Sequence, residues 1–303
     1  MGAPAPASRR SPVLVTGMPR SGTTWLARLL ATAPGTALAG REPMNPRGRQ
    51  YALAGTLPGW AELTTLSRRQ ERALRRAYRG RSPWVFSRYG RRQWAAPLPW
   101  TRLVMKDPFA MLSAPAVIRT TGATAVLLYR HPGAALASYR RMGWQPDLDE
   151  LRPIMQRHQE SHDGRGGGTR LPLPGDAEPA EAMGCFWSAL YEIALDHAGE
   201  APGLLIVSHE ELAAGGLPAA RRLFAALGLR WGTGTEAELL RESAGSGSAS
   251  ASAGLHDFAR SPRDVAGAWR AQLGDGELER VEAVTADVRA RLHEARFVLT
   301  DSD

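Results

Sequence analysis

Residues 12–25 read Pro12-Val13-Leu14-Val15-Thr16-Gly17-Met18-Pro19-Arg20-Ser21-Gly22-Thr23-Thr24-Trp25. The apolar run predicts a buried strand, and the glycines at 17 and 22 frame a phosphate-binding loop that leads into a helix. Backbone N–H groups at a helix N-terminus attract anions whatever the side chains are. The Lys-Ser/Thr pair of ATP-binding loops is replaced here by Thr23-Thr24, while Arg20 supplies a cation at the mouth of the loop. The stretch therefore predicts a phosphate site without the lysine that reaches the terminal phosphates of ATP.

Length and composition favour a single large domain. The chain has 303 residues, is 43% hydrophobic and carries a formal net charge of +8, so residues 11–300 can form one complete core. The excess of positive charge favours anionic ligands, of which nucleic acid is the less favoured case. A lone cysteine, Cys185, excludes a disulfide framework and a cysteine-based zinc site, and favours a reducing cytoplasm. Residues 1–10 lack an apolar core, so we expect a disordered leader and no membrane span.

The pattern of apolar runs predicts the fold class. Short runs at 103–105, 125–129 and 204–207 are typical of strands buried on both faces. Helices are expected after the first strand, just upstream of 204, and at 217–227 and 276–292. This alternation predicts an α/β, P-loop-type three-layer fold with a central, mostly parallel sheet flanked by helices. Segments rich in Gly, Pro and Ser at about 158–179 and 243–262 predict mobile loops, which are either lids or disorder.

A second candidate anion site follows the run at 125–129. Arg130 comes at the strand end, and Pro132 can begin a helix whose outward face carries Ser138 two turns later. Ligands of open parallel sheets bind at the carboxyl ends of the strands, where the loop at 17–24 must also lie. Two phosphate sites at one edge of the sheet predict a doubly phosphorylated nucleotide.

These motifs together resemble those of the sulfotransferases that use 3′-phosphoadenosine 5′-phosphosulfate (PAPS). The likeness is greatest to the branch that contains the carbohydrate and protein-tyrosine enzymes and many bacterial relatives. Besides the loop and the Arg130–Ser138 pair, it is carried by Lys106-Asp107-Pro108-Phe109, Cys185-Phe186-Trp187, Val207-Ser208-His209-Glu210-Glu211-Leu212 and Gly267-Ala268-Trp269-Arg270. The family likeness implies PAPS as the donor substrate, 3′-phosphoadenosine 5′-phosphate (PAP) as the product, and no metal.

The resemblance also implies roles for residues that bind the donor. Its 5′-phosphosulfate would be held by the loop residues Arg20, Ser21, Gly22, Thr23 and Thr24, and Trp25 would stack near the adenine. Packing in the core is the alternative interpretation of Trp25. Its 3′-phosphate would be bound by Arg130 and Ser138, joined by one of three later arginines: Arg260, Arg263 and Arg270.

Catalysis requires a base and a means of stabilising negative charge on the leaving oxygen. Arg20 and Lys106 suit the second task. By resemblance to the carbohydrate and tyrosine branch, Glu42 in Gly40-Arg41-Glu42-Pro43-Met44-Asn45-Pro46 is the candidate general base. Its alternative is a loop-end or capping carboxylate. The histidines are scattered without metal-ligand spacing, and His209-Glu210-Glu211 predicts a strand-end bonding cluster.

The acceptor site is expected in an insertion at about 43–102. It holds Trp60, Trp84, Trp94 and Trp100 among many arginines, a composition that suits a sugar, an aromatic metabolite or an anionic acceptor. The arginines between 68 and 81 equally suit the solvated face of a helix. Departures at Gly267 and Ala268, where tyrosine sulfotransferases carry a serine, weaken a claim of tyrosine sulfation.

The sequence therefore predicts a cytoplasmic sulfotransferase that acts on a hydroxyl of a carbohydrate or small-molecule metabolite. One alternative is a P-loop kinase or NTPase, which Thr23-Thr24 and the lack of a clear strand-end aspartate for magnesium disfavour. The other alternative is a noncatalytic nucleotide-binding protein.

Overall fold

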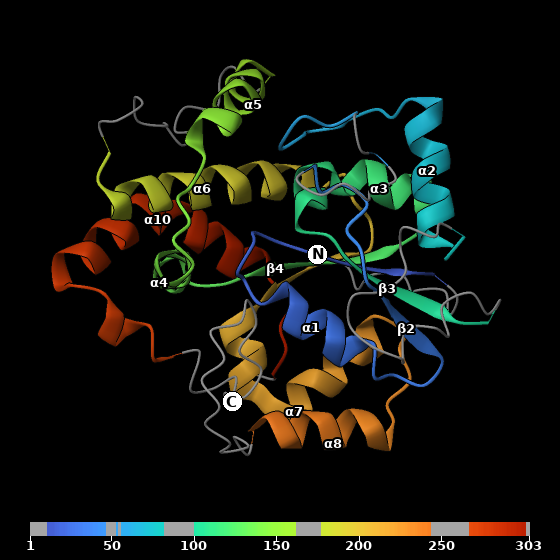
Figure 1. Cartoon of the computed structure of the whole chain (residues 1–303). Coiled ribbons are helices and arrows are strands. Elements are labelled where there is room, and N and C mark those ends of the chain that lie inside the picture. Colours follow the sequence, from blue (N-terminus) through green and yellow to red (C-terminus); the bar gives the residue numbers. More distant parts are fainter. Residues whose placement is uncertain are drawn as a thin grey trace.

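The central sheet is entirely parallel. The computed structural model describes residues 11–46, 53, 56–81, 100–161, 177–243 and 267–300. Within these ranges the strand order is β2-β3-β1-β4-β5, formed by β1 (Val13–Thr16), β2 (Thr36–Ala39), β3 (Arg102–Lys106), β4 (Thr124–Tyr129) and β5 (Leu204–Ser208). Helices cover both faces of this sheet (Figure 1), which confirms the predicted three-layer α/β architecture.

Alternating side chains along the strands build two separate cores. On β1, Val13 and Val15 pack on one face, where the helices are α1 (Thr23–Leu30), α7 (His209–Ala226) and α8 (Thr233–Ser243). Leu14 points to the opposite face because successive strand residues alternate. That face is covered by α3 (Ala114–Thr121), α6 (Pro179–Ala198) and α10 (Asp275–Ala295). Figure 1 shows the sheet between these two helical layers.

Further helices extend the larger core beside α3 and α6. Each of three helices contributes buried residues to this core: α2 (Arg68–Tyr78), α4 (Pro132–Arg141) and α5 (Leu148–Ser161). A 3₁₀ helix, η3 (Pro108–Ser113), connects β3 to α3. Among the described helices, none combines the length and the apolar character needed to cross a membrane.

The structure refines several expected boundaries. The predicted helices at 217–227 and 276–292 are the later part of α7 and most of α10. The loop expected from His158 begins later, because α5 continues to Ser161 and buries His158. α8 reaches Ser243, where the second loop was expected to start. The leader and most of both predicted loops lie outside the described residues.

Candidate active site

Glycines shape the anion loop between β1 and α1. Gly17 has φ +141°, and a Cβ there would lie 2.2 Å from the carbonyl oxygen of Leu128. Gly22, the N-cap of α1, has φ +96°, and a Cβ there would lie 2.5 Å from the ring of His209. Between them, Arg20 adopts φ +75°, a conformation that a side-chain-bearing residue rarely adopts and that concentrates at functional sites. The loop therefore tolerates no side chain at either glycine without a rearrangement.

Tyr191 of α6 fastens this loop to the sheet. Its hydroxyl donates to the carbonyl oxygen of Leu128 at 2.8 Å and accepts from the backbone N–H of Met18 at 3.3 Å. The side chain is completely buried, and this burial raises the pKa of the phenol. Sequence reasoning missed Tyr191, because its partners lie more than 60 residues away along the chain.

The two predicted phosphate sites meet in space. Nε of Arg20 donates to Oγ of Ser138 at 3.0 Å, so the loop contacts the helix that follows β4. Ser138 is only 2% exposed. The expectation that it lies on the outward face of α4 is therefore wrong, because the hydroxyl turns inward to the guanidinium.

A group of arginines surrounds this contact. Burial lowers the pKa of Arg130, and the charges of Arg141 and Arg20 add to the effect, although Glu210 opposes it. Burial and the charge of Arg141 likewise lower the pKa of Arg20. Arg141 was not among the predicted site residues. Like charges held together in this way attract a multivalent anion, which would relieve their repulsion.

The late segment that contains Arg270 docks beside the same helix. Trp269 stacks on His131 with ring centroids 4.5 Å apart, and it approaches closely because Gly133 has no side chain to meet it. The guanidinium of Arg270 lies 4.7 Å from the Trp269 ring centroid. Its charge contributes to the lowered pKa of His131, which places Arg270 near the start of α4. Arg260 and Arg263 lie outside the described residues.

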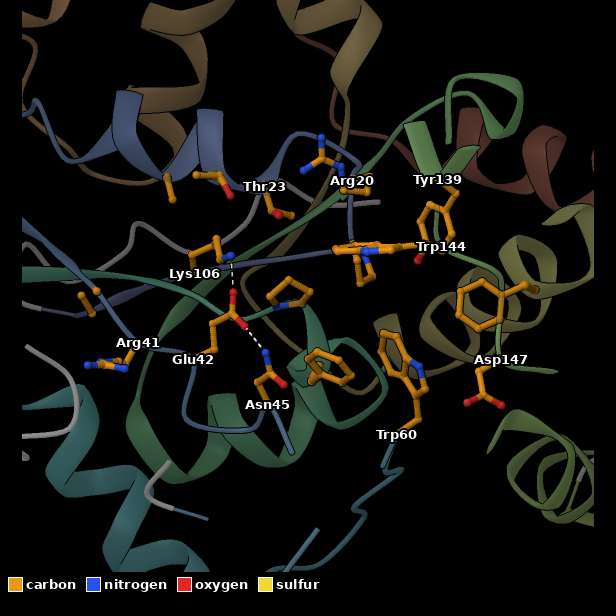
Figure 2. Close-up of a pocket in the computed structure, with 18 of the residues that line it drawn as sticks. Arg20, Thr23, Arg41, Glu42, Asn45, Trp60, Lys106, Tyr139, Trp144 and Asp147 are labelled. Carbon is orange, nitrogen blue, oxygen red and sulfur yellow. Dashed lines mark hydrogen bonds and ion pairs between the residues drawn. The ribbon is translucent and has the colours of Figure 1, made fainter. Parts of the chain in front are cut away.

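Glu42 and Lys106 form an ion pair at the ends of neighbouring strands. Lys106 ends β3, and Glu42 follows β2 in the loop after Ala39. Oε1 of Glu42 pairs with Nζ of Lys106, while Oε2 accepts from the amide of Asn45. Figure 2 shows Thr23 and Arg20 above this ion pair, whereas Arg41 points away from it. Both members of the pair are largely buried but keep some exposure, 15% for Lys106 and 17% for Glu42.

Asp107 fixes the loop that carries Glu42. Its Oδ2 accepts from the backbone N–H of Met44 at 2.6 Å. Burial, and then the charge of Glu42, raise the pKa of this carboxyl well above its usual value. Asp107 is an aspartate at the end of a strand, a position that could hold magnesium in a P-loop kinase or NTPase. Its side chain, however, is fully buried and does not line the cavity described next.

One cavity of about 600 Å³ connects these groups. Arg20, Thr23 and Thr24 line one part, and Glu42 and Lys106 line the next. The remaining wall is aromatic, with Trp60, Phe109, Tyr139, Trp144 and Phe186, and carries Asp147 beside Trp60. Tyr139, Trp144 and Asp147 belong to or follow α4, outside the predicted acceptor insertion.

Other predicted acceptor and donor residues lie elsewhere. Trp100 is 74% exposed and does not line the cavity, while Trp84 and Trp94 lie outside the described residues. The arginines of α2 are exposed, as expected for a solvated helical face. Trp25 is half-buried and packs against the core on the face of the sheet that α1, α7 and α8 cover. Its ring meets that of His209 edge-on, with ring centroids 5.4 Å apart. These contacts support the packing interpretation of Trp25.

The candidate residues form a row along the carboxyl edge of the sheet. In the strand order, Glu42 follows β2, Lys106 ends β3, the anion loop follows β1, Arg130 follows β4 and His209 follows β5. Glu210 accepts from the backbone N–H of His131 at 2.9 Å, which confirms a bonding cluster at the end of β5. The row places a cation and a carboxylate next to an anion loop, an arrangement suited to group transfer from an anionic donor.

Comparison with protein families identifies the kind of group that is transferred. The sequence matches the sulfotransferase family over residues 12–165, a range that contains the anion loop, the ion pair and α4. The chain belongs to the sulfotransferase family. This assignment makes it an enzyme that transfers a sulfuryl group.

Several solved structures are similar to this sulfotransferase at low sequence identity. The sulfotransferase domain from the curacin biosynthetic pathway is 16% identical, with a TM-score of 0.46, over 91% of this chain and 97% of that one. Mouse sulfotransferase SULT7A1, solved in complex with PAP, is 14% identical, with a TM-score of 0.47, over 95% of this chain and 89% of that one. A sulfotransferase from Alicyclobacillus acidocaldarius is 14% identical, with a TM-score of 0.46, over 95% of this chain and 97% of that one. Comparison with curated protein sequences finds no match.

Proposed function

We propose that this sulfotransferase uses PAPS as its donor and sulfates a hydroxyl of a small-molecule or carbohydrate acceptor. One observation carries the proposal. A single cavity leads from the anion loop, through the Glu42–Lys106 pair, to an aromatic wall. Donor, reacting groups and acceptor therefore have adjoining places in one space.

The donor end suits a nucleotide with phosphates on both sides of its ribose. The N-terminus of α1, with Thr23 and Thr24, offers N–H and O–H donors to the 5′-phosphosulfate. Arg130 and Arg270 offer charge for the 3′-phosphate near the start of α4. Ser138 accepts from Arg20 but retains its own O–H, which can donate to the same phosphate.

The reacting groups suit in-line transfer. The bond between sulfur and the 5′-phosphate oxygen breaks while the acceptor oxygen bonds to sulfur, and charge develops on the leaving oxygen. Arg20 and Lys106 stabilise that charge. Glu42 takes the proton of the acceptor hydroxyl, and the ion pair with Lys106 orients Glu42 before the acceptor binds.

The aromatic wall suits an acceptor with a flat or apolar body. Trp60 and Phe109 have ring centroids 4.6 Å apart, and Trp144 meets Tyr139 edge-on at 5.7 Å. Such faces bind aromatic rings and the apolar faces of sugars, while Asn45 and Asp147 supply polar contacts at the border.

Ligand-dependent melting tests the choice of donor. PAP should raise the melting temperature more than ADP or ATP at equal concentration, because only PAP engages both phosphate sites of the folded state. Equal shifts for all three nucleotides would contradict the two-site arrangement. A larger shift with ATP would instead favour a kinase or NTPase.

Mass spectrometry tests the choice of acceptor. The enzyme should be incubated with PAPS and a panel of phenols, alkyl alcohols and carbohydrates, and each product examined for the added mass of a sulfuryl group. Transfer to at least one hydroxyl compound, dependent on both PAPS and Lys106, is expected. PAP-induced stabilisation without transfer to any acceptor would favour a noncatalytic nucleotide-binding protein.

A further inference from the structure

A cluster of side chains of metal-ligating type includes Glu62, two residues after Trp60 of the aromatic wall. Glu62 follows the segment that carries Trp60, His158 is in the last turn of α5, and His197 is in the last turn of α6. Each offers one ligand atom, and these atoms all lie within 4.8 Å of one another. Spacing along the sequence did not predict this cluster, because 96 residues separate Glu62 from His158 and another 39 separate the two histidines.

The distances fit a small tetrahedral ion. Oε1 of Glu62 lies 3.6 Å from Nδ1 of His158 and 3.0 Å from Nε2 of His197. Zinc binds imidazole nitrogen and carboxylate oxygen at about 2.0–2.2 Å, which places neighbouring ligands of a tetrahedron roughly 3.4 Å apart. These two separations bracket that value, and the two histidine nitrogens lie within 4.8 Å of each other, so an ion fits between the three groups after small movements.

The outer contacts of a metal site are also present. Oδ2 of Asp196 lies 3.0 Å from Nε2 of His158, and Oδ1 of Asp196 pairs with Arg291. A carboxylate that accepts from one histidine nitrogen leaves the other nitrogen to bind the metal, as second-shell carboxylates do at zinc sites. Here it orients Nδ1 of His158 toward Glu62.

The backbone that carries Glu62 is held in place on both sides. Oγ of Ser113 donates to the carbonyl oxygen of Ala61 at 2.8 Å and accepts from the N–H of Leu63 at 2.9 Å. The side chain of His158 is only 3% exposed and that of Glu62 12%. The carboxylate is thus held in position before an ion binds.

We propose that Glu62, His158 and His197 bind a divalent transition-metal ion of the zinc type, with Asp196 as the carboxylate that orients His158. Two nitrogens and one oxygen leave a fourth position for water. The ion links the Trp60 segment to α5 and α6, and so stiffens one wall of the cavity without taking part in sulfuryl transfer.

Direct metal binding tests the proposal without any measurement of sulfation. The full chain, prepared without a histidine tag and treated with a chelator, is titrated with Co²⁺ and then with Zn²⁺. We expect one equivalent of Co²⁺ to give the visible absorption of a tetrahedral complex, and Zn²⁺ to displace it. A site that saturates only in the millimolar range, or that gives an octahedral spectrum, would overturn the proposal.

Variants assign the binding to these residues. His197→Gln should abolish the tetrahedral spectrum, and Asp196→Asn should weaken Zn²⁺ binding by about 10- to 100-fold, as expected for an outer-shell partner. His293→Gln, at an exposed histidine of α10, is the matched control and should bind like the unaltered chain. Unchanged affinity in His197→Gln would place the metal elsewhere and refute the assignment.

Melting curves distinguish a variant that cannot bind the metal from one that does not fold. Zn²⁺ should raise the melting temperature of the unaltered chain and of His293→Gln, but not that of His197→Gln. If His197→Gln melts normally in chelator and Zn²⁺ raises its melting temperature as much as that of the unaltered chain, the proposal is wrong.

Discussion

Single residues at the active site depend on others that never touch the cavity. Glu42 owes its position to Asp107, whose buried carboxyl accepts from Met44 two residues further along the loop. Removing that acceptor would leave a buried N–H without its partner, at a cost of about 1–3 kcal/mol. The loop that carries the proposed base is thus held by a side chain that does not line the cavity.

Glu42→Gln should separate binding from turnover. The amide keeps the shape of the side chain but cannot accept a proton, so kcat should fall at least about 100-fold, a typical general-base contribution. PAP should still raise the melting temperature normally. Glu71→Gln, at a half-exposed position of α2 that does not line the cavity, is the control, and near-normal turnover in Glu42→Gln would assign the base to another group.

Gly17→Ala should abolish donor binding and destabilise the fold. The new Cβ would lie 2.2 Å from a backbone oxygen that cannot move aside easily, so the free energy of unfolding should fall by about 2–4 kcal/mol.

Gly122→Ala is the matched control for this change. Gly122 also has a positive φ, +69°, but has open space around its Cβ position. Its substitution should cost only the backbone strain, about 1–2 kcal/mol, and leave PAP binding intact. Equal effects of both substitutions in denaturant titrations would show that the contact with Leu128 is unimportant.

Among the elements, α6 connects most parts of the site. It presents Phe186 to the cavity, Tyr191 to the anion loop and His197 to the metal-ligating cluster. Nε1 of Trp187 on the same helix donates to the carbonyl oxygen of Arg130 at 3.0 Å. A movement of this helix would therefore reach the donor and acceptor ends together.

Two tyrosine variants test this role of α6. Tyr191→Phe should lower the free energy of unfolding by about 1–3 kcal/mol and weaken PAP binding, because it removes both hydroxyl bonds to buried backbone groups. Tyr78→Phe should lower neither quantity, because the buried Tyr78 hydroxyl has no hydrogen-bond partner within the described ranges, so its removal breaks no bond there. The two proteins can be compared by urea denaturation with and without PAP, and similar losses in both would contradict the assigned contacts.

Sequence reasoning succeeded where the signal was local. The runs at 12–16, 103–105, 125–129 and 204–207 predicted four of the strands, because a short apolar run is typical of a strand buried on both faces. The edge strand β2 was missed, since Thr36-Ala37-Leu38-Ala39 is short and rich in small residues. Its pairing with β3, with Ala39 opposite Met105, appears only in the folded sheet.

The candidate site likewise contains residues that local sequence signals predict and residues that only long-range contacts bring together. The loop residues at 17–24 could be named because they follow a run that predicts a strand, and Lys106 because it lies at the end of another. Glu42 was named only by resemblance to the carbohydrate and tyrosine branch, since the strand before it was missed. The inward position of Ser138, the aromatic wall and the Glu62–His158–His197 cluster depend on contacts between distant segments. No spacing along the chain encodes those contacts.

The whole molecule should lose stability in mild acid. Burial lowers the pKa of His209 to about 3, and the charge of Arg130 adds to the effect. Between about pH 6.5 and pH 3 the unfolded chain therefore binds a proton that the folded chain does not. The free energy of unfolding falls as the pH falls, by up to about 1.4 kcal/mol per pH unit from this residue.

Urea denaturation at pH 6 and pH 5 isolates the contribution of His209. His209→Gln should show a pH dependence smaller by about 1 kcal/mol per pH unit than the unaltered chain. His293→Gln should keep the full dependence. A dependence that is identical in all three proteins would mean that His209 is not held neutral by the fold.

The row of groups along the sheet edge has a consequence for how such an enzyme can diversify. The proposed acceptor end is built from the segments around Trp60 and Trp144, whereas the proposed donor end is built from the loops after β1 and β4. Mutations can accumulate at one end of the row while the other end keeps its shape. A graft that exchanges only the acceptor segments should therefore redirect the enzyme to a new hydroxyl while it keeps the same nucleotide, so that one scaffold can serve many substrates.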